Sequence, residues 1–261
     1  MLDLASKEAV YRYIIDHSRA YYNAVDIVEE GADASATLSS FDGDPYYNYV
    51  IHKNGDLAAS MEKYWGLFEK YGREPMIYIS PASEYYGKEL ELEKFATDAF
   101  MFFEDETPLK NFQIPADVKV EVTENEEEFI KVWAAAHSDP GDLYGIASDV
   151  EIDGMRRFFA PPPAGFNHFA TAAYKNGVPV ANVVSVYNKD FLLITGFCVV
   201  PEHRGQGLGI ALIKDIVKRA HELGVPAVTL QTEAGSRTEE YYARRGFVSR
   251  FTGAYYRLRH Q

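Results

Sequence analysis

The apolar and polar residues in the second half of the chain alternate between strand-like and helix-like patterns. Residues 191–200 are almost all apolar and β-prone, as in a strand that is covered on both faces. Pro201 ends this strand, and a turn rich in glycine follows over residues 205–209. Apolar residues then recur at helical spacing from Leu208 onwards. The pattern therefore predicts a strand, a glycine-rich turn and a helix that begins at about Gly207.

Further elements of the second half follow from the same periodicities, and the Asn176-Gly177 pair is a strong hairpin signal. The expected elements are a strand over 118–122, a helix capped by Thr123 and Glu126 that continues to Ala136, a helix over 151–159, hairpin strands over 169–174 and 178–187, a strand from Val225, a helix with the capping pair Ser236 and Glu239 that ends at Gly246, and a last strand over 254–258. This order of hairpins and crossovers predicts an α/β fold of the α+β mixed-sheet type, with a central mixed β-sheet flanked by helices.

The first half of the chain repeats part of this pattern. Residues 70–80 resemble residues 222–231, because each stretch ends a helix, continues with a glycine and starts a strand with a proline. The elements expected here are a strand over 47–51, a helix from about Asp56, a helix over 83–95 and a strand over 99–103. Segment 52–56 stands where the glycine-rich turn would be, and it has one glycine and no arginine. We interpret residues 1–115 as a degenerate copy of the domain formed by residues 116–261; an unrelated α+β cap is the alternative.

The balance of acidic and basic side chains also differs between the two halves of the chain. Residues 1–117 carry 22 acidic and 10 basic side chains, whereas residues 118–261 carry 17 and 16, within a formal net charge of −13. The near-neutral half is the better host for an anionic ligand, and the acidic half could attract a cationic amine. An ordinary solvated acidic surface is the alternative for the acidic half. The negative charge argues against nucleic acid as a partner.

Composition narrows the class of protein further. The chain is 47% hydrophobic and has a single cysteine, Cys198, which excludes an internal disulfide. The sequence has no signal-peptide pattern and no apolar run of the length that crosses a membrane, so we expect a cytoplasmic protein with no membrane partner. Its seven histidines are scattered without metal-ligand spacing, so we expect no metal. Composition does not indicate an oligomeric state.

The glycine-rich turn is the best candidate for ligand chemistry. Glycine lets a backbone approach a ligand closely, and the first turn of a helix offers free N–H groups and a partial positive charge. A P-loop would need Lys-Ser/Thr where this chain has Ile210-Ala211, and a dinucleotide fingerprint would need glycine at position 210. The remaining interpretations are another type of phosphate loop and a tight turn without a ligand.

Two motifs indicate which phosphate loop this is. Arg204-x-x-Gly207-x-Gly209 directly follows the predicted strand, and a Tyr-x-x-x-Gly-Phe pattern starts at Tyr242, 35 residues after Gly207. In this order and at this distance, the motifs resemble those of the GCN5-related N-acetyltransferases, the GNAT superfamily. The resemblance covers about residues 117–261. With the degenerate first copy, it extends to tandem members that have two GNAT-like domains.

The resemblance implies that the second domain binds acetyl-CoA. Backbone groups of 198–200 would hold the pantetheine arm as an added strand does, and the Val200 N–H would polarise the thioester carbonyl. N–H groups of residues 205–210 would hold the pyrophosphate. The implied cofactor-binding residues are Cys198, Val199, Val200, Arg204, Gly205, Gln206, Gly207, Leu208, Gly209 and Ile210.

Acetyl transfer also needs an acid and a base, because the amine must lose a proton and the departing thiolate must gain one. The resemblance places Tyr242 beside the cofactor sulfur as the acid, with a packing role as the alternative. Members with a glutamate base carry it at the position of Leu193, so the resemblance supplies no direct carboxylate base at this position. A water relay is the expected base.

Three other side chains at strand ends, Asp190, His168 and Glu233, are candidate bases, and each is also typical of an ordinary surface residue. Cys198 is expected to be a core residue, because no histidine or aspartate near it in sequence suggests activation. We therefore expect direct attack by the amine in a ternary complex.

The predicted function is an acetyl-CoA-dependent N-acetyltransferase whose acceptor is a primary amine of a small molecule. Two alternatives remain at this point. One is acetylation of a protein N-terminus or lysine, and the other is a non-catalytic module that binds acyl-CoA.

Overall fold

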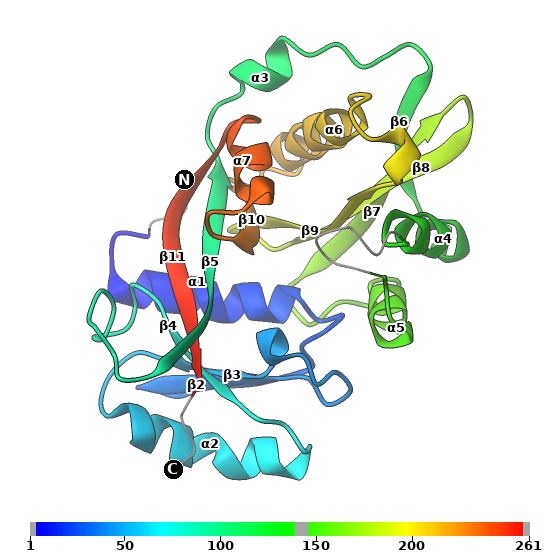
Figure 1. The fold of residues 1–261 in the computed structure, drawn as a ribbon. Helices are drawn as coiled ribbons and strands as arrows, with labels where there is room; N and C mark the ends of the chain where they lie inside the picture. Colours follow the sequence, from blue (N-terminus) through cyan, green and yellow to red (C-terminus); the bar gives the residue numbers. More distant parts are fainter. Residues whose placement is uncertain (1–3, 139–145, 258–261) are drawn as a thin grey trace. The chain divides into compact units, whose positions relative to one another are not determined.

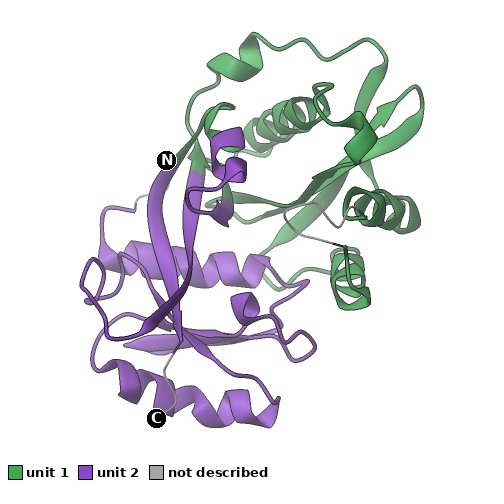
Figure 2. Ribbon diagram, in the orientation of Figure 1, with its two compact units in different colours: residues 1–2, 102–230, 242–248 green, residues 3–101, 231–241, 249–261 purple. Residues whose placement is uncertain are grey.

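The computed structural model describes residues 4–138 and 146–257 (Figure 1). They divide into two compact units, neither of which is one continuous stretch of chain (Figure 2). Unit 1 is mainly residues 102–230 and 242–248, and unit 2 is mainly residues 3–101, 231–241 and 249–261. Four elements have residues in both units: β5 (Glu93–Phe103), β10 (Val228–Glu233), α7 (Arg237–Ala243) and β11 (Phe247–Arg257). A domain boundary between residues 115 and 116 stays a prediction.

The strands of unit 1 form a mixed sheet in the order β10-β9-β8-β7-β6. The further bounds are β6 (Val118–Thr123), β7 (Asn167–Lys175), β8 (Val178–Tyr187), β9 (Leu192–Val199), α3 (Thr107–Lys110), α4 (Glu126–Ala136), α5 (Asp149–Arg157), the 3-10 helix η2 (Pro201–His203) and α6 (Leu208–Glu222). Strands β9 and β10 pair in parallel, and the other neighbours pair antiparallel. Both α4 and α6 contact β8 and β9, which explains why these strands are apolar almost throughout.

Unit 2 also contains a mixed sheet, in the order β1-β2-β3-β4-β11-β5-β10. Its further elements are α1 (Lys7–Ala20), β1 (Ile27–Glu29), β2 (Ala34–Leu38), the 3-10 helix η1 (Pro45–Tyr47), β3 (Tyr49–His52), α2 (Leu57–Lys70) and β4 (Met76–Ile79). Helix α2 buries Met61, Tyr64 and Phe68, which recur at helical spacing, against a cluster that includes Val50 and Ile77. One apolar stripe therefore fixes α2 on the sheet.

The predicted mixed α/β fold is confirmed, and several elements match closely. Helix α6 begins at Leu208 with Gly207 as its N-cap. The hairpin turns at Asn176 and Gly177, which have φ values of 50° and 79°. In unit 2, β3 and β4 form a parallel pair joined by α2, as β9 and β10 do through α6. This similarity is consistent with a degenerate copy in the first half, which stays a prediction.

The helix expected over 83–95 is wrong. Turns occupy residues 81–88, and β5 starts at Glu93. The hydroxyl groups of Ser80 and Ser83 accept hydrogen bonds from main-chain N–H groups two residues further on, and Gly87 has a φ of +75°. Such local bonds compete with helix formation.

Smaller corrections concern the ends of elements. Asn125, not Thr123, caps α4, since its side chain accepts a hydrogen bond from the Glu128 N–H at 3.1 Å while Thr123 is still in β6. Strand β10 starts at Val228 rather than at Val225. The last strand starts earlier than predicted, at Phe247, and its predicted end at Leu258 lies outside the described residues.

Candidate functional site

The candidate site in unit 1 is built around the loop that joins β9 to α6, which we call the anion loop (residues 204–209). After η2, Gly205 and Gly207 adopt φ values of +75° and +83°, and Gly207 becomes the N-cap of α6. The Ala211 N–H donates to the Gly207 carbonyl, so the N–H groups of residues 208–210 precede the first helical hydrogen bond. These donors and the positive end of the helix dipole form an environment suited to phosphate.

Two features of position 207 require glycine: a positive φ and a close neighbour that leaves no room for a side chain. A Cβ at this position would lie 2.9 Å from Cζ of Phe112, and φ is in the region that L side chains rarely adopt. The segment before β6 is held at this place because Lys214 Nζ donates to the Phe112 carbonyl at 2.8 Å. A side chain at position 207 would therefore displace both the loop and Phe112.

Arg204 is placed at the start of the anion loop with its guanidinium directed at main-chain oxygens. Its Nε donates to the Val199 carbonyl at 3.1 Å, and its Nη2 donates to the Ala136 carbonyl at 3.0 Å. Gln206 makes a bond within the loop region, from Nε2 to the Glu202 carbonyl at 3.0 Å. Contact of Arg204 and Gln206 with a cofactor stays a prediction.

Strand β9 separates from β10 beside this loop. Within the described residues, the ladder between them ends at the pair Leu193 and Thr229. The register of β9 with β8 shifts between Thr195 and Cys198, which is a bulge at Gly196 with φ of +58°. A Cβ on Gly196 would lie 2.5 Å from Cε of Met155 in α5, so glycine lets this helix pack against the bulge. The bulge leaves part of the edge of β9 outside the regular ladder.

The Val200 N–H and the Cys198 thiol, at the end of β9, are both bonded within the protein. The Val200 N–H donates to the Val180 carbonyl at 2.9 Å, so in this conformation it cannot polarise a thioester carbonyl, and that predicted role is not supported. Cys198 is buried and its Sγ donates to Oδ1 of Asn182 at 2.8 Å. Burial raises the pKa of the Cys198 thiol to about 12, which fits a core residue and not a nucleophile.

Tyr242 lies in α7 and is 7% exposed. Its ring meets the rings of Phe197 and Phe247 edge-on, with centroids 5.9 and 5.6 Å apart. Phe197 belongs to the bulged part of β9, so the motif tyrosine contacts the strand that separates from β10. These contacts hold the phenol through its ring, and its role as an acid stays a prediction.

The candidate bases are dispersed over several elements. Leu193 is fully buried in β9, so its position is part of the core. His168 is in β7, where burial lowers the pKa of its imidazole, and Asp190 is in the turn after β8, where its N–H donates to Asn188. Glu233 is exposed at the end of β10, in a part of the strand that belongs to unit 2. No geometry distinguishes one of them as a base.

In the corresponding segment of unit 2, between β3 and α2, several main-chain N–H groups already bond to other parts of the unit. The N–H groups of residues 53 and 54 donate to the Asp33 carbonyl at 2.9 and 3.0 Å, and the Gly55 N–H donates to Glu84 at 2.5 Å. The Asp56 carboxylate caps α2. Two carboxylates thus occupy the helix terminus where a phosphate would bind.

The sequence did not single out Phe112, Met155 or Asn182. An asparagine inside an apolar strand is a signal for a buried hydrogen-bonding role, which Asn182 fulfils by donating to the Phe129 carbonyl at 2.8 Å. Phe112 and Met155 have no such signal. Their roles arise from segments that are distant in sequence, such as Phe112 and Gly207.

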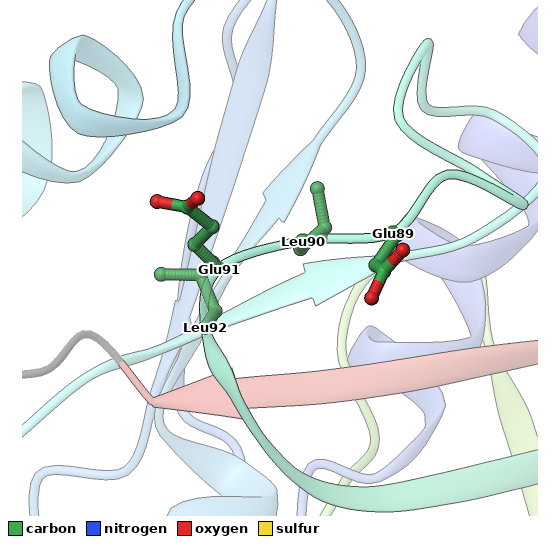
Figure 3. A pocket seen from close by; sticks show the side chains of 4 residues that line it. All are labelled: Glu89, Leu90, Glu91 and Leu92. Carbon is green, nitrogen blue, oxygen red and sulfur yellow. The ribbon is translucent and has the colours of Figure 1, made fainter.

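Unit 2 has an open surface pocket of about 680 Å³ lined by Glu89, Leu90, Glu91 and Leu92 (Figure 3). All four side chains belong to one stretch of backbone before β5, and Leu90 and Leu92 also pack against the apolar cluster under α2.

Over the residues described, no three His, Cys, Asp or Glu side chains are placed to hold a metal ion. In the same part of the chain, no helix is long and apolar enough to cross a membrane.

Comparison with known proteins agrees with the geometry of unit 1. Residues 124–247 match the model of the acetyltransferase (GNAT) family. No curated protein matches the chain.

Solved structures with low sequence identity share the fold. A GCN5-related N-acetyltransferase from Kribbella flavida is 16% identical, with a TM-score of 0.66 over 96% of each chain. A conserved protein of unknown function from Staphylococcus epidermidis is 16% identical, with a TM-score of 0.64 over 87% of this chain and 91% of that one. A tandem GNAT protein from the clavulanic acid biosynthesis pathway is 15% identical, with a TM-score of 0.57 over 85% and 77%.

Proposed function

We propose that this acyltransferase, whose residues 124–247 belong to the acetyltransferase (GNAT) family, moves the acetyl group of acetyl-CoA to a primary amine of a small molecule. The observation that carries the proposal is the anion loop at the N-terminus of α6, which follows η2 and the strand that separates from β10. The free N–H groups at the helix N-terminus suit a pyrophosphate, and the adjacent open edge of β9 suits an extended arm that contains amides. Together they suit a long ligand that has both parts.

The residues of the loop fit such a ligand. N–H groups of residues 205–210 would hold the pyrophosphate, and the main chain of β9 from the Gly196 bulge to Val199 would hold the pantetheine arm. When bound, acetyl-CoA supplies an activated thioester. The chain has to place an amine beside it and to manage two protons.

Tyr242 would provide one proton, from Oη to the departing sulfur. Its ring is fixed between Phe197 and Phe247, so a change at the hydroxyl need not disturb packing. The protonated amine, with a pKa near 10.4, first loses a proton to water, because only the free amine has a lone pair for the attack. Its nitrogen then forms the bond to the acetyl carbon as the carbon–sulfur bond breaks. The nitrogen loses its second proton to water, in line with the dispersed candidate bases, and water returns a proton to the Tyr242 phenolate. The buried Cys198 takes no part.

A panel of amines tests the proposal through release of free CoA. The panel would contain alkylamines, polyamines, amino-acid esters, a lysine peptide and a peptide with a free N-terminus, and a thiol reagent would report the CoA. Cys198 gives little background because its thiol is buried. Release with a small amine supports the proposal, and release with peptides alone would show a protein acetyltransferase. Binding of acetyl-CoA without release with any amine would show a non-catalytic module.

A further inference from the structure

Arg204 connects three parts of unit 1 that are distant in sequence. It starts the anion loop, its Nε bonds the end of β9 at Val199, and its Nη2 bonds the end of α4 at Ala136. Residues 136 and 204 are 68 positions apart. The side chain that the sequence assigns to the cofactor is thus bonded to the protein's own main chain.

The bond to Ala136 is made at a chemically specific place. Ala136 is the last residue of α4, and its carbonyl is one of those that a helix leaves without an internal partner. The negative end of the helix dipole also lies there, so a guanidinium donates to this carbonyl more strongly than a neutral group would. Arg204 therefore acts as a remote cap for α4.

The anion loop depends on such anchors because its backbone is permissive. Gly205 and Gly207 allow conformations outside the usual regions, and a Cβ at Gly205 would meet nothing within 4 Å. Gln206 ties the loop to residue 202 and, through a hydrogen bond that its Oε1 accepts from Lys175, to β7, whereas Arg204 ties it to the ends of α4 and β9. The two bonds of Arg204 are therefore the anchors that join the start of the loop to the end of α4.

We propose that Arg204 is a positioning residue that couples the anion loop to the end of α4, so that acetyl-CoA bound at the loop also orders this end of the helix. The inference rests on the proposed function, because it takes the loop as the site of the pyrophosphate. Coupling between two sites is reciprocal. Order at the end of α4 therefore raises the affinity of the loop for the cofactor.

The experiment compares three variants of the full chain. Arg204→Ala removes the tie. Arg204→Gln keeps an N–H donor for a carbonyl but loses the charge, and Arg204→Lys keeps the charge but cannot bond two carbonyls in the planar geometry of a guanidinium. Lys218→Gln is the matched control, because it removes one positive charge from an exposed position of α6. Circular dichroism establishes that each variant is folded.

Hydrogen exchange at residues 133–137 and calorimetric titration with acetyl-CoA provide the readouts. Acetyl-CoA slows exchange at the end of α4 in the wild type and in Lys218→Gln. In Arg204→Ala, exchange there is faster without ligand by about tenfold, as for the loss of a charge-assisted hydrogen bond, and acetyl-CoA no longer slows it. Arg204→Gln retains more affinity for acetyl-CoA than Arg204→Lys does.

Two results would overturn the coupling. The first is exchange at the end of α4 that Arg204→Ala leaves unchanged. The second is an affinity order in which Lys exceeds Gln, together with a weaker salt dependence in Arg204→Gln, which would make Arg204 a direct phosphate ligand. If the wild type does not bind acetyl-CoA, the proposed function fails, and the coupling with it. Binding by the wild type without an effect of Arg204→Ala on α4 removes the coupling alone.

Discussion

At the scale of single residues, the proposed role of Tyr242 as an acid predicts how the loss of its hydroxyl group affects turnover. Tyr242→Phe removes one hydroxyl and keeps the ring contacts with Phe197 and Phe247. If Oη protonates the departing sulfur, turnover with the acceptor falls by about 10²–10⁴ while acetyl-CoA affinity barely changes. Steady-state kinetics and calorimetry measure the two quantities. Tyr241→Phe, one residue away on the same helix, is the control, and near wild-type turnover in Tyr242→Phe would give Tyr242 a structural role only.

Gly207 makes the second prediction at this scale. In Gly207→Val, the new side chain meets the Phe112 ring and forces a strained φ, so the anion loop cannot keep its shape. Acetyl-CoA binding should be lost in calorimetry. Gly224→Val is the matched control, because Gly224 has a φ of +69° with nothing within 4 Å of a Cβ. That control should lose about 1–2 kcal/mol of unfolding free energy and still bind; unchanged affinity in Gly207→Val would remove the loop from the site.

At the scale of elements, strands β5, β10 and β11 enclose a buried carboxyl group in unit 2. Asp98 of β5 is 4% exposed; it accepts a hydrogen bond from the Gln231 side chain and interacts with the Tyr255 hydroxyl. Burial raises the pKa of Asp98 from 3.8 to about 7. The folded state therefore holds a proton that the unfolded chain has lost between these two pH values.

This pKa predicts how stability depends on pH. The contribution of Asp98 to the unfolding free energy is complete below about pH 4, falls as pH rises towards 7, and is lost above it, with a size on the order of 4 kcal/mol. Asp98→Asn stays neutral and keeps an oxygen for Gln231, so it should be more stable than the wild type at pH 8 and similar at pH 4. Urea unfolding at several pH values measures the difference. A wild-type-to-variant difference that does not change with pH would contradict the raised pKa.

At the scale of the whole molecule, we expect acetyl-CoA to bind at the helix N-terminus that follows β9 and not at the one that follows β3. The N-terminus of α6 follows a glycine-rich loop, whereas that of α2 carries the carboxylates of Asp56 and Glu84. Acetyl-CoA should therefore bind with one equivalent per chain, and removing those carboxylates in Asp56→Asn/Glu84→Gln should not create a second site, since the N–H groups of residues 53 and 54 stay bonded to Asp33. Calorimetric stoichiometry is the measurement. Two equivalents in the wild type would show that unit 2 also binds cofactor.

Local patterns in the sequence predicted the elements that depend on neighbouring residues. The Asn176-Gly177 hairpin, the start of α6 directly after Gly207 and the helix with Tyr242 follow from turn, cap and periodicity signals that act over a few residues. The prediction of a helix over 83–95 was wrong because of interactions that are equally local. The side chains of Ser80 and Ser83 accept hydrogen bonds from the nearby backbone and stabilise turns there. The motifs around Arg204 and Tyr242 indicated the resemblance to the GNAT family, whose model matches residues 124–247, because their spacing is a property of the chain alone.

Contacts between distant segments were decided by the tertiary structure. The sequence by itself predicted a glycine-rich loop before a helix, a mixed sheet and a resemblance to the acetyltransferase (GNAT) family, whose model matches residues 124–247. It could not place Phe112 against Gly207 or the Arg204 guanidinium on the Ala136 carbonyl, because packing and hydrogen bonds select these partners from the whole chain. Nor could it show that the Val200 N–H is taken by Val180, or that β5, β10 and β11 each contribute to both units. Strand pairing between distant segments depends on burial of complete faces, and a single strand's pattern does not name its neighbour.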